Sequence, residues 1–170
     1  MAKSAWLFTS CSLLMSALFA YSASVQLNDH DWYLWFPLYS SACVVNLFHL
    51  AIASKPLFRH VAKATLLLGV SLFLKVVMEH VTSGKAALWS LDMSQRMVRE
   101  KTGSGLVICS MILHLEALDK TLRPPQRHRR HTIPRWVSLG MAALLCFSIG
   151  LPLFFFVIQR GEMEFDNIHQ

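Results

Sequence analysis

The chain has 170 residues, a formal net charge of +6 and a mean hydropathy of +0.43, and only 15% of its residues are charged. A typical soluble domain carries about 25% charged residues, so this composition excludes an ordinary soluble protein and indicates an integral membrane protein. Five membrane-spanning helices of about 20 residues take up roughly 100 residues. No separate soluble domain then fits, and we expect residues 1–170 to form a single membrane domain.

Five apolar stretches, separated by charged residues and helix breakers, predict an all-α bundle of five transmembrane helices. They cover residues 4–25, 32–53, 61–81, 103–121 and 134–158. The segment 83–101, between the third and fourth stretches, is too polar to cross a bilayer. Its apolar residues predict either a short amphipathic helix lying on the membrane surface or a plain surface connector. They are Leu88, Trp89, Leu91, Met93, Met97 and Val98.

The first stretch has a second interpretation. Lys3, the apolar run and the small residues of Ala20-Tyr21-Ser22-Ala23-Ser24 resemble a signal peptide with a cleavage site. The run is long enough to span, so we expect it to be retained as a helix. Its removal would leave the other four spans with the same orientation.

Charges between the spans are sorted by side. The N-terminus and the 54–63 and 119–135 loops hold ten of the 16 basic residues, whereas the 26–31 turn, the 79–102 segment and the C-terminal tail hold eight of the ten acidic residues. The positive-inside rule therefore predicts a cytoplasmic N-terminus and a lumenal or extracellular C-terminus. The basic residues of the 120–135 loop, Arg127, Arg129 and Arg130 among them, hold this topology and attract anionic lipid headgroups. We expect no nucleic-acid partner, because this loop lies between two spans.

Small residues recur every four positions on two spans. The first ladder is Ser12, Ser16, Ala20 and Ser24, and the second is Ser138, Ala142, Cys146 and Gly150. Small residues at this spacing let two helices approach closely in lipid. The ladders predict helix packing within the monomer or, as a sharper alternative, a homo- or hetero-oligomer face.

The four cysteines, Cys11, Cys43, Cys109 and Cys146, all lie inside predicted spans, and no pair has the spacing of a zinc site. Motifs for phosphate loops, nucleophile elbows and zinc proteases are also missing. The sequence therefore predicts no catalytic residue, metal site or cofactor. Within the third span, Lys75 and Glu79 are one turn apart and are expected to pair near its outer end.

The turn after the first span is the most specific local pattern. It reads Gln26-Leu27-Asn28-Asp29-His30-Asp31, followed by Trp32, Trp35 and Tyr39. With Arg99-Glu100 shortly before Gly105-Leu106-Val107-Ile108, this pattern resembles the transmembrane protein 220 family over roughly residues 5–115. His30 stands where that family has proline, and Arg96 stands where an acid often precedes the Arg-Glu pair. The resemblance implies a small multi-span membrane protein and no particular activity.

Two interpretations of these polar residues remain open. In the structural one, Asp31 caps the second helix and Asn28 and Asp29 stabilise a tight turn. In the functional one, Asp29, Asp31 and Glu100 converge to bind a hard cation or to hydrolyse a lipid headgroup.

Arg99 connects the two interpretations, because an ion pair with Asp29 or Asp31 makes the site a brace. The candidate polar site or brace therefore consists of Gln26, Asn28, Asp29, Asp31, Arg99 and Glu100. The sequence favours a non-enzymatic membrane component over a small membrane enzyme, and either over an ion- or proton-handling protein.

Overall fold

The computed structural model describes residues 2–52, 56–82, 96–122 and 134–166. These residues form five helices, as the sequence predicts. The helices are α1 (Ala2–Gln26), α2 (Trp32–Ile52), α3 (Pro56–Thr82), α4 (Arg96–Leu122) and α5 (Arg135–Asp166).

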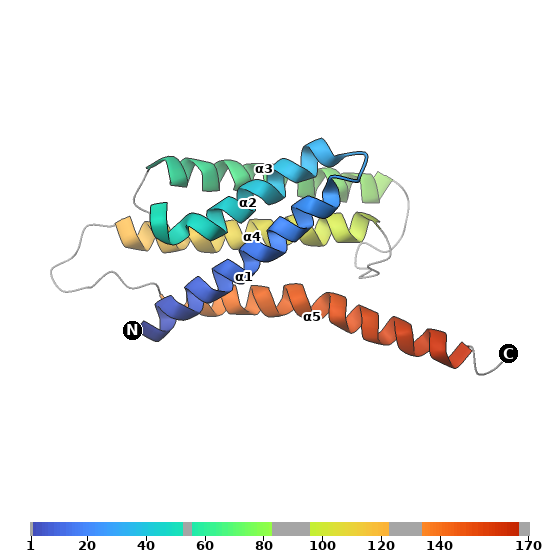
Figure 1. Cartoon of the computed structure of the whole chain (residues 1–170). Helices are drawn as coiled ribbons and strands as arrows, with labels where there is room; N and C mark the ends of the chain where they lie inside the picture. Colours follow the sequence, from blue (N-terminus) through green and yellow to red (C-terminus); the bar gives the residue numbers. More distant parts are fainter. Residues whose placement is uncertain (1, 53–55, 83–95, 123–133, 167–170) are drawn as a thin grey trace.

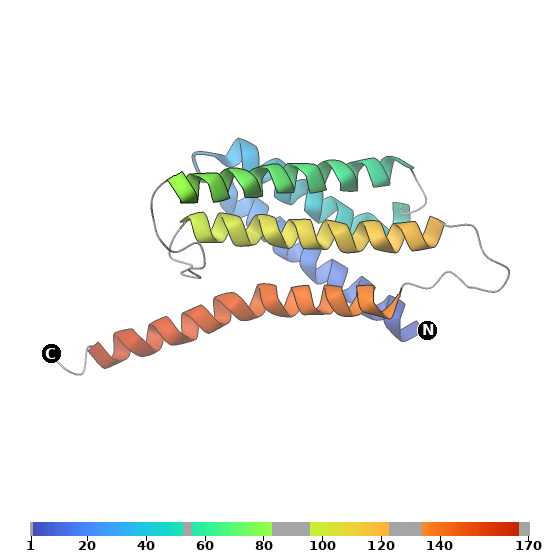
Figure 2. The ribbon, with the colours of Figure 1, turned by 180° about the vertical axis from the view of Figure 1, so that it is seen from behind.

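Successive helices run in opposite directions (Figure 1). The starts of α1, α3 and α5 and the ends of α2 and α4 lie at one end of the bundle, and the α1–α2 turn lies at the other. The tightest pairings are α1 with α2 and α3 with α4, whereas α5 packs on α1 and α4. The second half of α5 runs away from the other helices, as the reverse view also shows (Figure 2).

Two helices begin five or more residues earlier than their apolar stretches predict. α3 starts at Pro56 rather than 61, and α4 starts at Arg96 rather than 103. The stretch added to α4 is mostly polar, whereas the stretch added to α3 includes Leu57 and Phe58, and backbone hydrogen bonding continues through both. The predicted surface segment is therefore wrong for residues 96–101, which belong to α4, and its residues 83–95 lie outside the described part of the chain.

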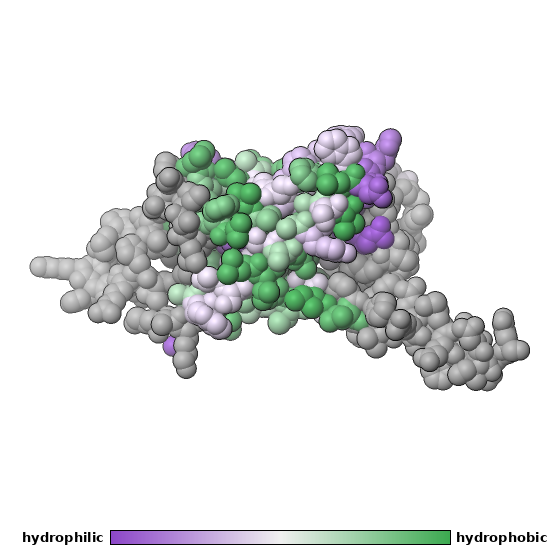
Figure 3. All heavy atoms as spheres, in the orientation of Figure 1, coloured by the Kyte–Doolittle hydropathy of each residue, from purple (hydrophilic) through white to green (hydrophobic). Residues whose placement is uncertain are grey.

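Apolar side chains lie both inside and outside the bundle. On α1, Phe8, Met15 and Phe19 are buried, whereas Leu13 and Leu14 are exposed. On the face that Figure 3 shows, apolar residues spread over the middle of the described part, and the α1–α2 turn carries hydrophilic ones. Two stretches, Ala5–Gln26 and Leu57–Glu79, are long and apolar enough to cross a membrane, and Arg135–Gly150 is a shorter apolar helix. A helix that is apolar all round belongs in a core or in lipid.

Each small-residue ladder is only partly inside the monomer. Ser12, Ser16 and Ser138 are buried, but Ala20 and Ser24 are exposed, as are Cys146 and Gly150. A four-residue repeat drifts around a helix of 3.6 residues per turn, so one ladder cannot stay on one face. Where the first ladder faces α2, the Ser16 hydroxyl donates to the Cys43 carbonyl at 3.2 Å.

Candidate functional site

The backbone between α1 and α2 closes through short-range hydrogen bonds. The Asp29 N–H donates to the Gln26 carbonyl at 3.0 Å, and the Trp32 N–H donates to the Asp29 carbonyl at 3.3 Å. The Asp31 carbonyl then accepts from the Leu34 N–H at 3.0 Å, and α2 begins at Trp32. Asp31 therefore occupies the N-cap position that the sequence predicts, where a carboxylate also favours the positive end of the helix dipole.

The polar side chains of this turn differ in exposure. Asn28 is exposed, whereas Asp29 and Asp31 are half-buried. The Gln26 side-chain carbonyl oxygen is buried and has no hydrogen-bond partner among the described residues. An amide oxygen in this state costs free energy and leaves one acceptor available at the turn.

The second half of the predicted site lies on α4, whose start is at the same end of the molecule as the turn (Figure 1). Arg99 is exposed, but Glu100 is only 7% exposed and acts electrostatically on the hydroxyl of buried Tyr39 on α2. Tyr39 also stands against Gly103, where a Cβ would collide with its hydroxyl. The structure thus brings the Arg99-Glu100 segment against α2. The ion pair of Arg99 with Asp29 or Asp31, and the convergence of the three carboxylates, stay predictions.

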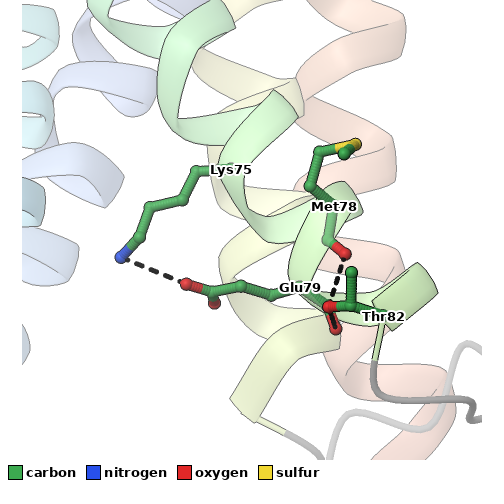
Figure 4. A network of polar contacts seen from close by, with 4 residues as sticks. All are labelled: Lys75, Met78, Glu79 and Thr82. Carbon is green, nitrogen blue, oxygen red and sulfur yellow. Dashed lines mark hydrogen bonds and ion pairs between the residues drawn. The ribbon is translucent and has the colours of Figure 1, made fainter.

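The predicted pair on the third span is confirmed. The Lys75 ammonium lies 3.5 Å from a Glu79 carboxylate oxygen, and both side chains are more than 40% exposed. The Thr82 hydroxyl caps the same turn by donating to the Met78 carbonyl at 2.9 Å (Figure 4). An exposed pair of this kind contributes little to stability. It neutralises two charges near the end of a helix.

A buried polar cluster, which the sequence analysis missed, connects α2 to α4. It consists of Asn46, Ser110 and His114, and none of them is more than 2% exposed. The Ser110 hydroxyl lies 3.2 Å from Asn46 Oδ1 and 3.1 Å from Asn46 Nδ2, and His114 Nε2 lies 2.9 Å from Asn46 Oδ1. Phe8 of α1 packs edge-on against the His114 ring, with centroids 5.3 Å apart. Three helices thus meet at these side chains.

The orientation of Asn46 follows from its neighbours. Its Nδ2 donates to the Ala42 carbonyl at 2.9 Å, and a carbonyl can only accept, so Oδ1 faces His114. Because Oδ1 is an acceptor, His114 must carry a proton on Nε2. The cluster therefore fixes Nε2 of the His114 imidazole as a hydrogen-bond donor.

A sequence signal for this cluster does exist. Ser110 and His114 are four residues apart and share one face of α4, and Asn46 is the one amide inside the second apolar stretch. Polar residues inside spans usually face the bundle interior. This tendency would place all three residues toward the interior, but it does not show that they contact one another.

The described residues contain no group of three histidine, cysteine or acidic side chains positioned to hold a metal ion. Cys11, Cys43, Cys109 and Cys146 are all free thiols. The arrangements found are hydrogen-bonded contacts between helices and an acidic turn at one end. They can hold helices in register and bind polar groups at that end.

A bundle of antiparallel helices with long apolar spans and hydrogen-bonded polar side chains inside is a helical integral membrane protein. The family model described as transmembrane family 220, helix, matches residues 18–116, which is more than half of the chain. The chain belongs to this family, and the matched range includes both the α1–α2 turn and the Arg99-Glu100 segment. No curated protein and no solved structure matches the chain.

Proposed function

We propose that this protein spans the membrane five times and acts as a non-enzymatic membrane component through packing with lipids or partner helices. One observation carries the proposal: polar side chains in the middle of two helices are buried, whereas large apolar side chains close to them in sequence are exposed. Asn46 is buried beside exposed Leu47 and Phe48, and buried Thr65 stands beside exposed Leu67. Soluble helices show the reverse pattern, so this arrangement suits lipid.

Exposed aromatic residues at both ends of the bundle support the same placement. Trp6 and Trp136 are exposed near the starts of α1 and α5, and Tyr21, Trp32 and Tyr33 are exposed near the α1–α2 turn. Trp and Tyr favour the lipid–water boundary because their rings are amphipathic. Trp6 and Tyr21 are separated by about 22 Å along α1 at 1.5 Å per residue, which is of the order of an apolar bilayer core.

We further propose that the N-terminus is cytoplasmic and the C-terminus lumenal or extracellular. The sorting of basic residues supports this orientation: Arg59, Lys63 and Arg135 lie at the end where α3 and α5 begin. Anionic headgroups are then the expected lipid partners of the 120–135 loop, which is largely outside the described residues.

Cysteine accessibility tests the span number and orientation. In a cysteine-free background, Asn28→Cys and Arg135→Cys place single thiols at opposite ends, both at exposed positions. In sealed membrane vesicles whose cytoplasmic face is outward, an impermeant maleimide should label the Arg135→Cys protein at once and the Asn28→Cys protein only after permeabilisation. Equal labelling of both would refute the five-span topology, and the reverse order would refute the orientation.

The alternative function is a cation-binding or hydrolytic site made by Asp29, Asp31 and Glu100. The observation that favours it is the place of Glu100, which is buried near the start of α4, at the same end of the bundle as the α1–α2 turn. A triple Asp29→Asn, Asp31→Asn, Glu100→Gln variant separates the two functions. If the site binds a cation, Mg²⁺ or Ca²⁺ should raise the melting temperature of the native protein and not of the variant. If the turn is structural, neither ion has an effect and the variant is less stable.

A further inference from the structure

A hollow lies between α3 and α4 at the end of the bundle where α3 begins and α4 ends. Its volume is about 220 Å³, and it is lined by Arg59, Lys63, Ile112, Leu115, Glu116 and Asp119. α3 supplies both basic residues, and α4 supplies both acidic and both apolar ones. This hollow has no part in the polar turn or in the buried cluster described above.

The charges of the hollow form two levels. At its outer level, the Arg59 guanidinium lies 3.5 Å from the Asp119 carboxylate. One helical turn farther in, Lys63 is exposed and Glu116 is half-buried, and neither pairs with any residue that the structure describes. Charged groups at the edge of a bilayer are favourable only when water or an opposite charge meets them. The inner level thus offers one cation and one anion to a ligand.

The apolar lining begins at Leu115, beside Glu116, and continues deeper to Ile112. Ile112 is seven residues before Asp119, which is about 10 Å along α4 at 1.5 Å per residue, and Leu115 lies between them. Ile112 is 46% exposed. The hollow is therefore charged toward the end of the bundle and apolar toward its middle, which is the order of headgroup and acyl chain in a phospholipid.

We propose that this hollow binds a phospholipid whose headgroup is zwitterionic and ends in a primary amine. Lys63 and Arg59 contact the phosphate, Glu116 accepts hydrogen bonds from the ammonium, and an acyl chain lies along Ile112 and Leu115. The inference rests on the proposed membrane placement, which brings this end to a lipid–water boundary.

Charge balance selects the headgroup class. The hollow has two basic and two acidic residues, so an anionic headgroup meets repulsion from Glu116 and Asp119, and a lone cation meets repulsion from Arg59 and Lys63. A zwitterion satisfies both signs. Quaternary ammonium groups are recognised by aromatic cages, and none of the six lining residues is aromatic, whereas a primary ammonium has three N–H donors for a carboxylate.

The test uses the full chain in detergent micelles and compares three lipids of matched acyl chains: phosphatidylethanolamine, phosphatidylcholine and phosphatidylglycerol. Native mass spectrometry measures the bound fraction of each. Phosphatidylethanolamine should bind about tenfold more tightly than either of the others, as expected for one added charge-assisted contact. Equal binding of all three, or a preference for phosphatidylglycerol, would overturn the proposal.

Two variants locate the contacts. Glu116→Gln should abolish the preference for phosphatidylethanolamine over phosphatidylcholine. Lys63→Gln should weaken the binding of all three lipids. Lys75→Gln removes an exposed lysine of the same helix that is outside the hollow, and it should change nothing. A preference that survives Glu116→Gln contradicts the proposal. If Glu116→Gln fails to fold, the lipid preference of the native protein and the effect of Lys63→Gln on lipid binding still test the proposal.

Micelles have no sidedness, so this experiment does not depend on the orientation. A wrong topology would appear in the cysteine labelling and leave the lipid preference intact. A missing lipid preference would leave the labelling pattern intact.

Discussion

Asn46 makes the contact between α2 and α4 depend on hydrogen bonds as well as on shape. Its amide satisfies the Ala42 carbonyl, the Ser110 hydroxyl and His114 Nε2 at once. All three side chains are buried, so each lost contact leaves a buried polar group with one partner fewer, which costs free energy. Hydrogen bonds between membrane helices contribute about 0.6 kcal/mol on average, because the unfolded helices find other partners in the membrane.

Replacing Asn46 by alanine should therefore lower the free energy of unfolding by about 1–2 kcal/mol, since Ser110 and His114 lose a partner together. Ser41→Ala is the matched control: it removes a hydroxyl of the same helix that bonds only the local carbonyls of Pro37 and Leu38. It should change stability by less than about 0.5 kcal/mol. Denaturation in mixed micelles measures both, and equal effects of the two variants would argue against a coupled cluster.

Gly103 is where a single methyl group should matter. A Cβ there would meet the Tyr39 hydroxyl, whereas a Cβ at Gly105, two residues along α4, meets nothing within 4 Å. Gly103→Ala should lower stability by about 1–3 kcal/mol through overpacking, and Gly105→Ala should be neutral or stabilising because alanine favours the helix.

Adding Tyr39→Phe to Gly103→Ala removes the colliding oxygen and should restore part of the lost stability. The measurement compares the melting temperatures of the native protein, the two glycine variants and the double variant in one detergent. An unchanged melting temperature of Gly103→Ala would mean that α2 and α4 do not approach closely at this level.

At the scale of the elements, helix ends follow capping and backbone hydrogen bonding rather than hydropathy. α2 begins where Asp31 predicts it, because an acidic residue at an N-cap is a local signal. α3 and α4 begin five and seven residues before their predicted apolar stretches, since an extra helical turn continues the backbone hydrogen bonding at little cost. The length of an apolar stretch thus predicts the part of a helix that would cross a bilayer, whereas the helix itself extends beyond that stretch.

Asp31→Ala should lower stability by about 1 kcal/mol, the usual contribution of an N-cap, whereas Asp31→Asn should have little effect, because asparagine caps equally well. His30→Ala, at the neighbouring exposed position, is the control and should be silent. Thermal unfolding followed by helical circular dichroism compares the variants. A large loss in Asp31→Asn would show that the charge, and not the cap, is what the turn requires.

For the whole molecule, the packing of α1 bears on whether the first span is retained. Phe8, Met15 and Phe19 of α1 are buried against the other helices, and Ser148 of α5 approaches the Met15 sulfur at 3.8 Å. Cleavage after this span would expose the faces of α2 and α5 that these residues cover. A signal peptide makes no such contacts in a mature fold.

The protein isolated from membranes should therefore contain residues 2–26. The intact mass of the purified chain measures this directly. In a tryptic digest of the same sample, a peptide ending at Lys63 serves as the reference for detection of the N-terminal peptides. A mature chain that begins near residue 25 would contradict the retention of α1. The same result would leave the orientation of the remaining helices as proposed.

The prediction of this fold from sequence worked where the physics is local. Apolar runs, Asp31 and the i,i+4 pair of Lys75 and Glu79 act within one helix or one turn, and the structure confirms the five helices, the cap position and the ion pair. The cluster of Asn46 with Ser110 and His114 joins residues more than 60 positions apart, and nothing local indicates that they meet. The convergence of Asp29, Asp31 and Glu100 is of this second kind and stays a prediction.

The sequence by itself determined that the chain is helical, that it belongs in a membrane and which of its ends carries the positive charge, because apolar length and charge act segment by segment. Only the tertiary structure decided which polar residues face each other, that Tyr39 stands against Gly103, and that Lys63 and Glu116 line one hollow. In lipid, apolar residues are favourable on both the inner and the outer face of a helix, so hydropathy does not reveal which face packs. That choice depends on shape and hydrogen bonding between helices.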